Sequence, residues 1–123
     1  YLNSNQDPFM NGQVRYMINL DDMSIGYIDL YNFNIVHSRA GVGIFIDKKF
    51  RKKGIANIAL KTLIEISSKE LHLNQLFAEV FQSNKAAISL FEHAGFTLSG
   101  LKKQWIRKQE AYEDLLFFQL MNT

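Results

Sequence analysis

The sequence predicts an α/β fold in which helices flank a mixed, partly antiparallel sheet. Two observations carry this prediction. Apolar side chains recur with a period of two in segments 13–20, 25–33, 40–46 and 75–81, which is typical of strands. Between the last two segments the apolar spacing changes to three and four residues over 54–71, which is typical of a helix with one buried face. The 123 residues are expected to form one domain.

The first two strands are expected to form a hairpin. Residues 21–24 form a turn between them, so the strands pair antiparallel. Residues 1–12 are polar, contain the only proline and are interpreted as a loop. A second loop, 34–39, leads to the third strand. Its His37 can lie near a bound substrate, although an exposed loop histidine without a function is the commoner case.

The long helix connects two strands that should be parallel neighbours, because a strand–helix–strand connection of this length is right-handed. A shorter helix follows the second of these strands. Ser83 or Asn84 can cap its N-terminus, and Ala87, Ile88 and Phe91 share one of its faces. A glycine in the left-handed conformation, residue 95, is expected to end it.

Segments 96–103 and 111–120 are expected to close the sheet as an antiparallel hairpin around a loop over 104–110. Cations between 102 and 108 interleave there with Trp105, a pattern that can serve a nucleic-acid patch. A solvated hairpin face is the favoured interpretation, because no nucleic-acid motif accompanies the cations.

Composition narrows the classes of protein. Hydrophobic residues make up 47% of the chain and include ten phenylalanines and five tyrosines, which favours a packed core over disorder. The absence of cysteine excludes disulfides and thiolate metal sites, and His37, His72 and His93 have no metal-ligand spacing, so no metal site is expected. No apolar run has the length of a membrane span, and no signal peptide is evident. We therefore expect a cytoplasmic protein with no membrane partner.

A basic loop over 47–53 places five cations directly before Gly54, where the long helix begins. Cations at a helix N-terminus oppose the helix dipole, so local stability does not explain them. An anionic ligand does explain them, because free N–H groups of the first turn and nearby cations form an anion site, and diphosphate is the natural candidate. A solvated turn that binds nothing is the alternative. A Walker loop is disfavoured, because Ile55 and Ala56 follow the glycine where that loop needs Lys and a hydroxyl.

Two motifs now point to a known family. The run Arg51-Lys52-Lys53-Gly54-Ile55-Ala56 matches the pattern Arg/Gln-x-x-Gly-x-Gly/Ala, and segment 84–96 begins with Asn, continues as a helix and ends in Gly-Phe. Both resemble motifs of the GNAT superfamily of acyl-coenzyme A-dependent N-acetyltransferases. Segments 12–18, 25–30 and 37–40 resemble the branch of ribosomal-protein N-terminal and spermidine acetyltransferases. Such proteins usually begin with a further strand and helices, so the chain is expected to be N-terminally truncated relative to the family.

The resemblance implies a GNAT-like sheet, mostly antiparallel, whose central parallel strand pair splays apart to receive the pantetheine arm of acetyl-coenzyme A. The residues that it implies for donor binding are Phe45, Ile46, Arg51, Lys52, Lys53, Gly54, Ile55, Ala56, Asn84, Ala87 and Phe91. Asn84 can equally be a helix cap, and Phe91 can equally be a core aromatic.

The chemistry implied is attack of a neutral amine on a thioester. The backbone N–H of Ile46 is the candidate oxyanion donor. Glu79 is the candidate base; a structural carboxylate or an ion-pair partner is its alternative role. Phe91 stands at the position where many members of the superfamily carry a tyrosine that protonates the leaving thiolate. Phenylalanine cannot donate a proton, so Ser89 or water is the candidate proton donor.

The sequence therefore predicts transfer of acetyl from acetyl-coenzyme A to a primary amine: a protein N-terminus, a polyamine or another small amine. Gly41 weakens the polyamine option, because the spermidine-type branch often has an acidic residue there. A non-catalytic acyl-coenzyme A sensor or interaction module is the first alternative, and a nucleic-acid-binding domain is the second. A homodimer is left open.

Overall fold

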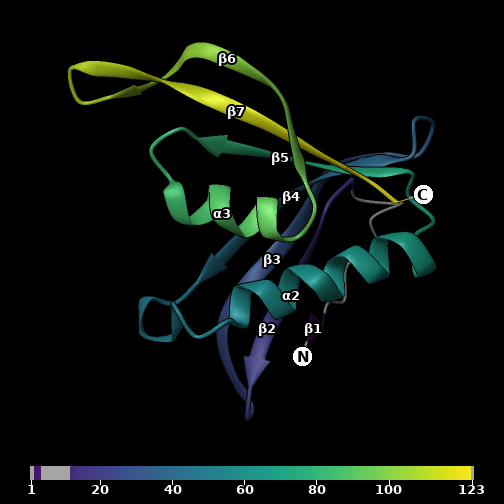
Figure 1. Ribbon diagram of the computed structural model, residues 1–123. Coiled ribbons are helices and arrows are strands. Elements are labelled where there is room, and N and C mark those ends of the chain that lie inside the picture. Colours follow the sequence, from purple (N-terminus) through teal and green to yellow (C-terminus); the bar gives the residue numbers. More distant parts are fainter. Residues whose placement is uncertain (1, 4–11, 123) are drawn as a thin grey trace.

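A computed structural model describes residues 2–3 and 12–122. Within these residues the strands form one seven-stranded sheet in the order β1-β2-β3-β4-β5-β7-β6 (Figure 1). The strands are β1 (Leu2–Asn3), β2 (Val14–Leu20), β3 (Met23–Asn34), β4 (Arg39–Ile46), β5 (Gln75–Phe81), β6 (Thr97–Lys108) and β7 (Ala111–Met121). The helices are α2 (Ile55–Glu65) and α3 (Lys85–His93), with the helical turns η1 (Lys48–Phe50) and η2 (Ile66–Glu70). Among the strands of the described residues only β4 and β5 are parallel neighbours, which confirms the predicted mixed, mostly antiparallel sheet.

The hairpin of β2 and β3 forms as predicted, with a turn shorter than expected. Asp21 and Asp22 both lie in the left-handed region, with φ of 49° and 70°, which suits a two-residue turn between twisted strands. Consequently β3 already begins at Met23. The loop predicted for 1–12 is wrong at Leu2–Asn3, which pairs with β2. Residues 4–11 of that prediction lie outside the described residues.

The two parallel strands pair only at one end. Pairing runs from Arg39 opposite Gln75 to Gly41 opposite Phe77, and β4 continues for five more residues without β5 beside it. The predicted splay of the central strand pair is therefore present. Helix α2 with η2 fills the predicted 54–71 helix, except that its last turn is a π-helix.

The predicted short helix is α3. The Asn84 side chain caps it by accepting a hydrogen bond of 3.1 Å from the N–H of Ala87. At its end Gly95 has φ of 101°, and the N–H of Phe96 donates to the Phe91 carbonyl oxygen. These contacts form the left-handed termination that a glycine favours.

The loop predicted over 104–110 is wrong. Strand β6 continues to Lys108, and only residues 109–110 turn before β7 begins. A bulge between Lys102 and Ile106 accommodates the polar stretch: Gln104 adopts φ of 50° and its N–H donates to Asp114 Oδ1 at 2.9 Å. Because β6 is an exposed edge strand, its residues lack the buried alternation by which sequence indicates a strand.

Both helices pack on one face of the sheet, where the core lies (Figure 1). Ile28, Leu30, Leu76 and Phe118 from the strands meet Leu60 and Leu63 of α2 there, all at 1% exposure or less. The side chains that alternate with the buried strand residues point to the opposite face. That face, which we call the open face, is covered by no helix of the part of the chain that the structure describes. No described helix has the length and apolarity of a membrane span.

Candidate functional site

The basic loop is built to leave the first turn of α2 accessible. Residue 54 adopts φ of 79°, a conformation that glycine enters without steric cost, and an ideal β carbon there meets nothing within 4 Å. The first bond of the helix runs from the N–H of Ile58 to the Gly54 carbonyl oxygen at 3.2 Å. The N–H groups of Ile55, Ala56 and Asn57 therefore have no partner within the helix. They remain available to an anion.

Arg51 links this loop to the end of β4. Its Nε donates a hydrogen bond of 2.8 Å to the carbonyl oxygen of Ile46, and its guanidinium carbon lies 5.6 Å from the centre of the Phe45 ring. A guanidinium has further N–H groups in the same plane. Arg51 can therefore hold the loop and still present donors to a ligand.

A cleft of about 730 Å³ lies between the end of β4, the start of α2 and helix α3. Nine of the predicted donor-binding residues line it: Phe45, Ile46, Arg51, Lys52, Gly54, Ile55, Ala56, Asn84 and Ala87. Ser89, the candidate proton donor, lines it as well. Two segments far apart in sequence, 44–57 and 84–93, are thus brought to one cavity.

The open edge of β4 supplies backbone groups to this cleft. The N–H of Asp47 donates to the Ile25 carbonyl oxygen at 2.7 Å, so the adjacent pair, Gly26 opposite Ile46, is the type in which backbone groups point outward. The backbone groups of Ile46 therefore point toward the gap beside β5. Those of Phe45 point toward β3, since a β carbon on residue 26 would overlap the Phe45 carbonyl oxygen. Phe45 lines the cleft at the strand end, and its ring, 44% exposed, stacks on that of Tyr27 at 5.4 Å.

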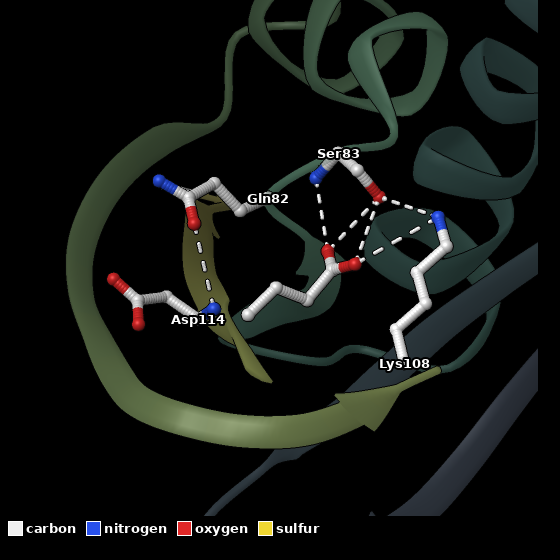
Figure 2. Close-up of polar contacts among 5 residues, drawn as sticks. Gln82, Ser83, Lys108 and Asp114 are labelled. Atoms are coloured by element: carbon white, nitrogen blue, oxygen red, sulfur yellow. Dashed lines mark hydrogen bonds and ion pairs between the residues drawn. The ribbon is translucent and has the colours of Figure 1, made fainter. Parts of the chain in front are cut away.

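The start of α3 is fixed to the β6–β7 hairpin, as Figure 2 shows. The backbone N–H and the Oγ of Ser83 each donate to Glu113 Oε1 at 3.0 Å, and Lys108 Nζ lies 3.9 Å from Glu113 Oε2. The backbone hydrogen bond from Ser83, before any other cause, lowers the pKa of Glu113. Gln82 adds a contact to the Asp114 backbone. The hairpin thereby positions Asn84 at the rim of the cleft.

Three predicted site residues do not line the cleft. Lys53 is exposed, with its Nζ 5.7 Å from the centre of the Phe50 ring. Phe91 is buried at 3% exposure and packs edge to face on Phe96 at 5.1 Å, as a core aromatic does. Glu79 lies on the open face, with Oε2 3.6 Å from Lys102 Nζ. It stands two residues past Phe77, the last residue of β5 paired to β4, and so borders the gap from the other side of the sheet.

Sequence reasoning missed several lining residues. They are Ile44, Phe50, Asn57, Ala86, Leu90 and His93. A signal existed for two of them: Ile44 shares the strand face of Ile46, and Asn57 belongs to the first helical turn.

His37, the loop histidine considered as a possible substrate neighbour, is exposed. Its backbone N–H donates a hydrogen bond of 2.9 Å to Asn34 Oδ1. Among the described residues no three His, Cys, Asp or Glu side chains converge as a metal site would require.

Comparison with known proteins agrees with this geometry. Residues 2–97 match the family described as "Acetyltransferase (GNAT) domain". "Putative ribosomal N-acetyltransferase YdaF" of Bacillus subtilis is 29% identical over 101 residues, which are 82% of this chain and 55% of that protein. The spermidine N(1)-acetyltransferase of Escherichia coli K12 is 30% identical over 86 residues, or 70% of this chain and 46% of that protein. The chain therefore spans about half the length of these curated relatives.

Solved structures share the fold. A dodecameric spermidine N-acetyltransferase from Vibrio cholerae superposes with a TM-score of 0.85 at 23% identity, over 91% of this chain and 66% of that one. A crystal structure titled "Probable acetyltransferase" superposes with a TM-score of 0.84 at 26% identity, over 92% of this chain and 64% of that one. At such identities the likeness establishes the arrangement of the backbone.

Proposed function

Because the chain belongs to the GNAT acetyltransferase family, we propose that its cleft binds acetyl-coenzyme A and that the chain transfers the acetyl group to a primary amine. One observation carries the proposal. The accessible first turn of α2, the open edge of β4 and the capped start of α3 line a single cleft. A diphosphate would need the first of these features, and the amide-bearing arm that leads to the thioester would need the other two.

The diphosphate occupies the first turn of α2. The N–H groups of Ile55, Ala56 and Asn57 donate to its oxygens, and Arg51 and Lys52, which line the same cleft, supply positive charge. Lys53 points elsewhere and contributes only to the local potential.

The pantetheine arm follows the open edge of β4 toward the gap beside β5. Its amides take the place of a neighbouring strand, as added strands do at a sheet edge. Asn84 remains a candidate contact through its amide nitrogen, since its Oδ1 is engaged in the helix cap. Ala87 lines the cavity, whereas Phe91 supports it from the core.

The thioester carbon lies at the gap, where the neutral amine attacks it. A C–N bond forms, the carbonyl oxygen becomes an oxyanion, and the N–H of Ile46 donates to that oxyanion. The C–S bond then breaks and the thiolate leaves. Much of the acceleration comes from holding both reactants in this geometry.

The nitrogen must lose two protons, one before it attacks and one as the tetrahedral intermediate collapses, and the thiolate must gain one. The second proton of the nitrogen can pass through water to the leaving thiolate. An alkylammonium has a pKa of about 10, so a base has to take a proton for the amine to attack. Glu79 borders the gap and is our candidate, acting directly or through water. The thiolate takes a proton from water or from Ser89, because the Phe91 side chain has none to give.

The acceptor is a protein N-terminus, a polyamine or another small amine, as the names of the relatives suggest for those proteins. Assembly with further copies is proposed because a dodecameric spermidine N-acetyltransferase shares the fold. The cytoplasmic location expected from the sequence is kept as a proposal. The nucleic-acid alternative loses support, because the 48–53 and 102–108 cations come from separate elements and only the first group borders the cleft.

Calorimetric titration of acetyl-coenzyme A into the folded chain tests the proposal. The Arg51→Ala/Lys52→Ala variant should weaken binding by about tenfold or more, because it removes two charges from the cleft. The Lys61→Ala/Lys69→Ala variant removes the same charge elsewhere and should bind like the unaltered chain. A chain that is folded by circular dichroism yet binds no acetyl-coenzyme A would refute the proposal. Binding without transfer to any amine in a panel would favour the non-catalytic sensor.

A further inference from the structure

The open face carries a continuous aromatic surface beside the gap. Tyr31, Gly41 and Phe77 stand in one row across β3, β4 and β5, and Phe117 of β7 is next to them. The Tyr31 and Phe77 rings meet edge to face at 5.7 Å, and the Phe77 and Phe117 rings stack at 5.3 Å. All three rings are half-buried, so each keeps an accessible part.

The glycine in this row is what lets the rings lie together. A β carbon on residue 41 would come within 2.5 Å of Tyr31 Cζ and within 2.9 Å of Phe77 Cε2. The ring of Tyr31 therefore occupies the space that any side chain at position 41 would need. An acidic residue has no room at this point of the open face.

One carboxylate stands at the edge of the aromatic surface. Glu79 follows Phe77 on the same side of β5 and is opposite Phe117 in the register with β7. Its ion pair with Lys102 is long, at 3.6 Å, and both side chains are partly exposed. Burial, and after it the charge of Glu79, raises the pKa of Tyr31 to about 12, which agrees with the closeness of phenol and carboxylate.

Two further carboxylates of the sheet, on β3 and β7, are already paired with cations. Asp29 is bound in a two-pronged ion pair by Arg15, at 2.8 and 2.9 Å. At the far end of the hairpin, Glu113 is held by Ser83 and Lys108. Asp29 and Glu113 thus each already have a cation beside them. To reach Asp29, the second ammonium group of a polycation would have to displace Arg15 from a two-pronged pair that is shorter than the 3.6 Å contact between Lys102 and Glu79.

We propose that the acceptor amine binds on this aromatic surface and that the surface selects a singly charged amine borne on an apolar or aromatic group over a polyamine. The ammonium lies near Glu79 and displaces Lys102, while the apolar body covers the rings of Phe77 and Phe117. Cation–π attraction and burial of apolar area both favour such a ligand. The catalytic part of this inference depends on the proposed acetyl transfer; the binding part does not.

The test compares phenethylamine with spermidine and ethanolamine as acceptors at fixed acetyl-coenzyme A. We expect kcat/KM for phenethylamine to exceed that for spermidine by about tenfold. The Phe117→Leu variant should lose about tenfold in kcat/KM for phenethylamine and clearly less for spermidine, whose methylene chain needs no aromatic partner, while acetyl-coenzyme A affinity stays the same. Tyr112→Leu, which removes an aromatic residue that is 57% exposed at the far end of β7, is the matched control and should have no effect.

A second measurement separates this inference from the proposed function. NMR titration of ring-labelled phenylalanine with phenethylamine alone should shift the Phe77 and Phe117 signals, whether or not transfer occurs. Transfer that prefers spermidine would leave the proposed function intact and overturn the selectivity. The proposed site would be wrong if the signals of these two rings did not move. It would also be wrong if sedimentation showed a dimer in which a second copy covers the rings.

Discussion

The guanidinium Nε of Arg51 donates a hydrogen bond of 2.8 Å to the carbonyl oxygen of Ile46. This contact joins the two halves of the proposed donor site: the basic loop that faces the diphosphate, and the strand end whose N–H faces the thioester. It also engages the carbonyl oxygen of Ile46 and leaves the N–H of Ile46 to the proposed oxyanion of the thioester. We therefore propose that the Arg51 side chain both holds the loop and binds the diphosphate.

Replacing Arg51 by lysine should separate these tasks. Lysine keeps the charge but cannot make a planar fork of N–H donors, so we expect acetyl-coenzyme A affinity to fall by about tenfold by calorimetry. Lys49→Ala, in the same loop but outside the cleft, is the control and should bind normally. Equal affinity for Arg51→Lys and the unaltered chain would mean that charge alone is used.

Glu79→Gln should lower kcat by a factor of about 10² at neutral pH, because an amide cannot accept the proton of the attacking amine. The shape of the pH–rate profile should change with it, while acetyl-coenzyme A affinity stays constant, since Glu79 lies on the other face of the sheet. Glu92→Gln on α3 controls for loss of an exposed charge. Unchanged turnover and an unchanged profile would remove Glu79 from the mechanism.

Gly41→Ala should destabilise the fold by about 1–3 kcal/mol, because its β carbon would collide with the rings of Tyr31 and Phe77. Gly43→Ala, two residues along the same strand, is the control and should not cause such a collision, since a β carbon there meets nothing within 4 Å. Thermal unfolding of both variants measures the difference. Equal melting temperatures would show that the aromatic row can move aside without cost.

Tyr31 should ionise at a higher pH than an ordinary tyrosine. Burial raises the pKa of Tyr31 to about 12, with Glu79 adding to the effect. A raised pKa in the folded state means that the phenol stabilises the fold fully below about pH 10 and that this contribution is lost as the pH rises toward 12. Ultraviolet titration of tyrosinate should lose its latest step in Tyr31→Phe and keep it in Tyr112→Phe. A latest step that survives in Tyr31→Phe would contradict the assignment.

The Ser83–Glu113 contact should loosen in acid. The lowered pKa of Glu113 comes first from the Ser83 backbone N–H, so its stabilising effect is present above the ordinary carboxyl pKa of about 4.5 and is lost as the pH falls below it. Amide hydrogen exchange at the start of α3 should accelerate there, and Glu113→Gln should show fast exchange already at neutral pH. Glu110→Gln, in the turn, should exchange normally. Identical exchange in all three chains would exclude a positioning role.

Local pattern determined most of the fold. The periods of strands β2 to β5 and of helix α2 follow from which side chains must be buried, and the caps at Asn84 and Gly95 follow from backbone chemistry within a few residues. The same holds for the basic loop and the first turn of α2, because a run of six residues contains both. The end of β6 was predicted wrongly, because an exposed edge strand has no buried face and therefore no alternation of apolar residues in its sequence.

Tertiary structure alone decided which faces these residues share. Sequence spacing could place Glu79 near a cleft but could not say that it stands across the sheet from the diphosphate loop, or that Lys102 reaches it. It could note Gly41 but not that the ring of Tyr31 fills the space above it. Such facts depend on the register between strands that are distant in the chain, and a register is fixed only when the whole core packs and every strand must bury the same face.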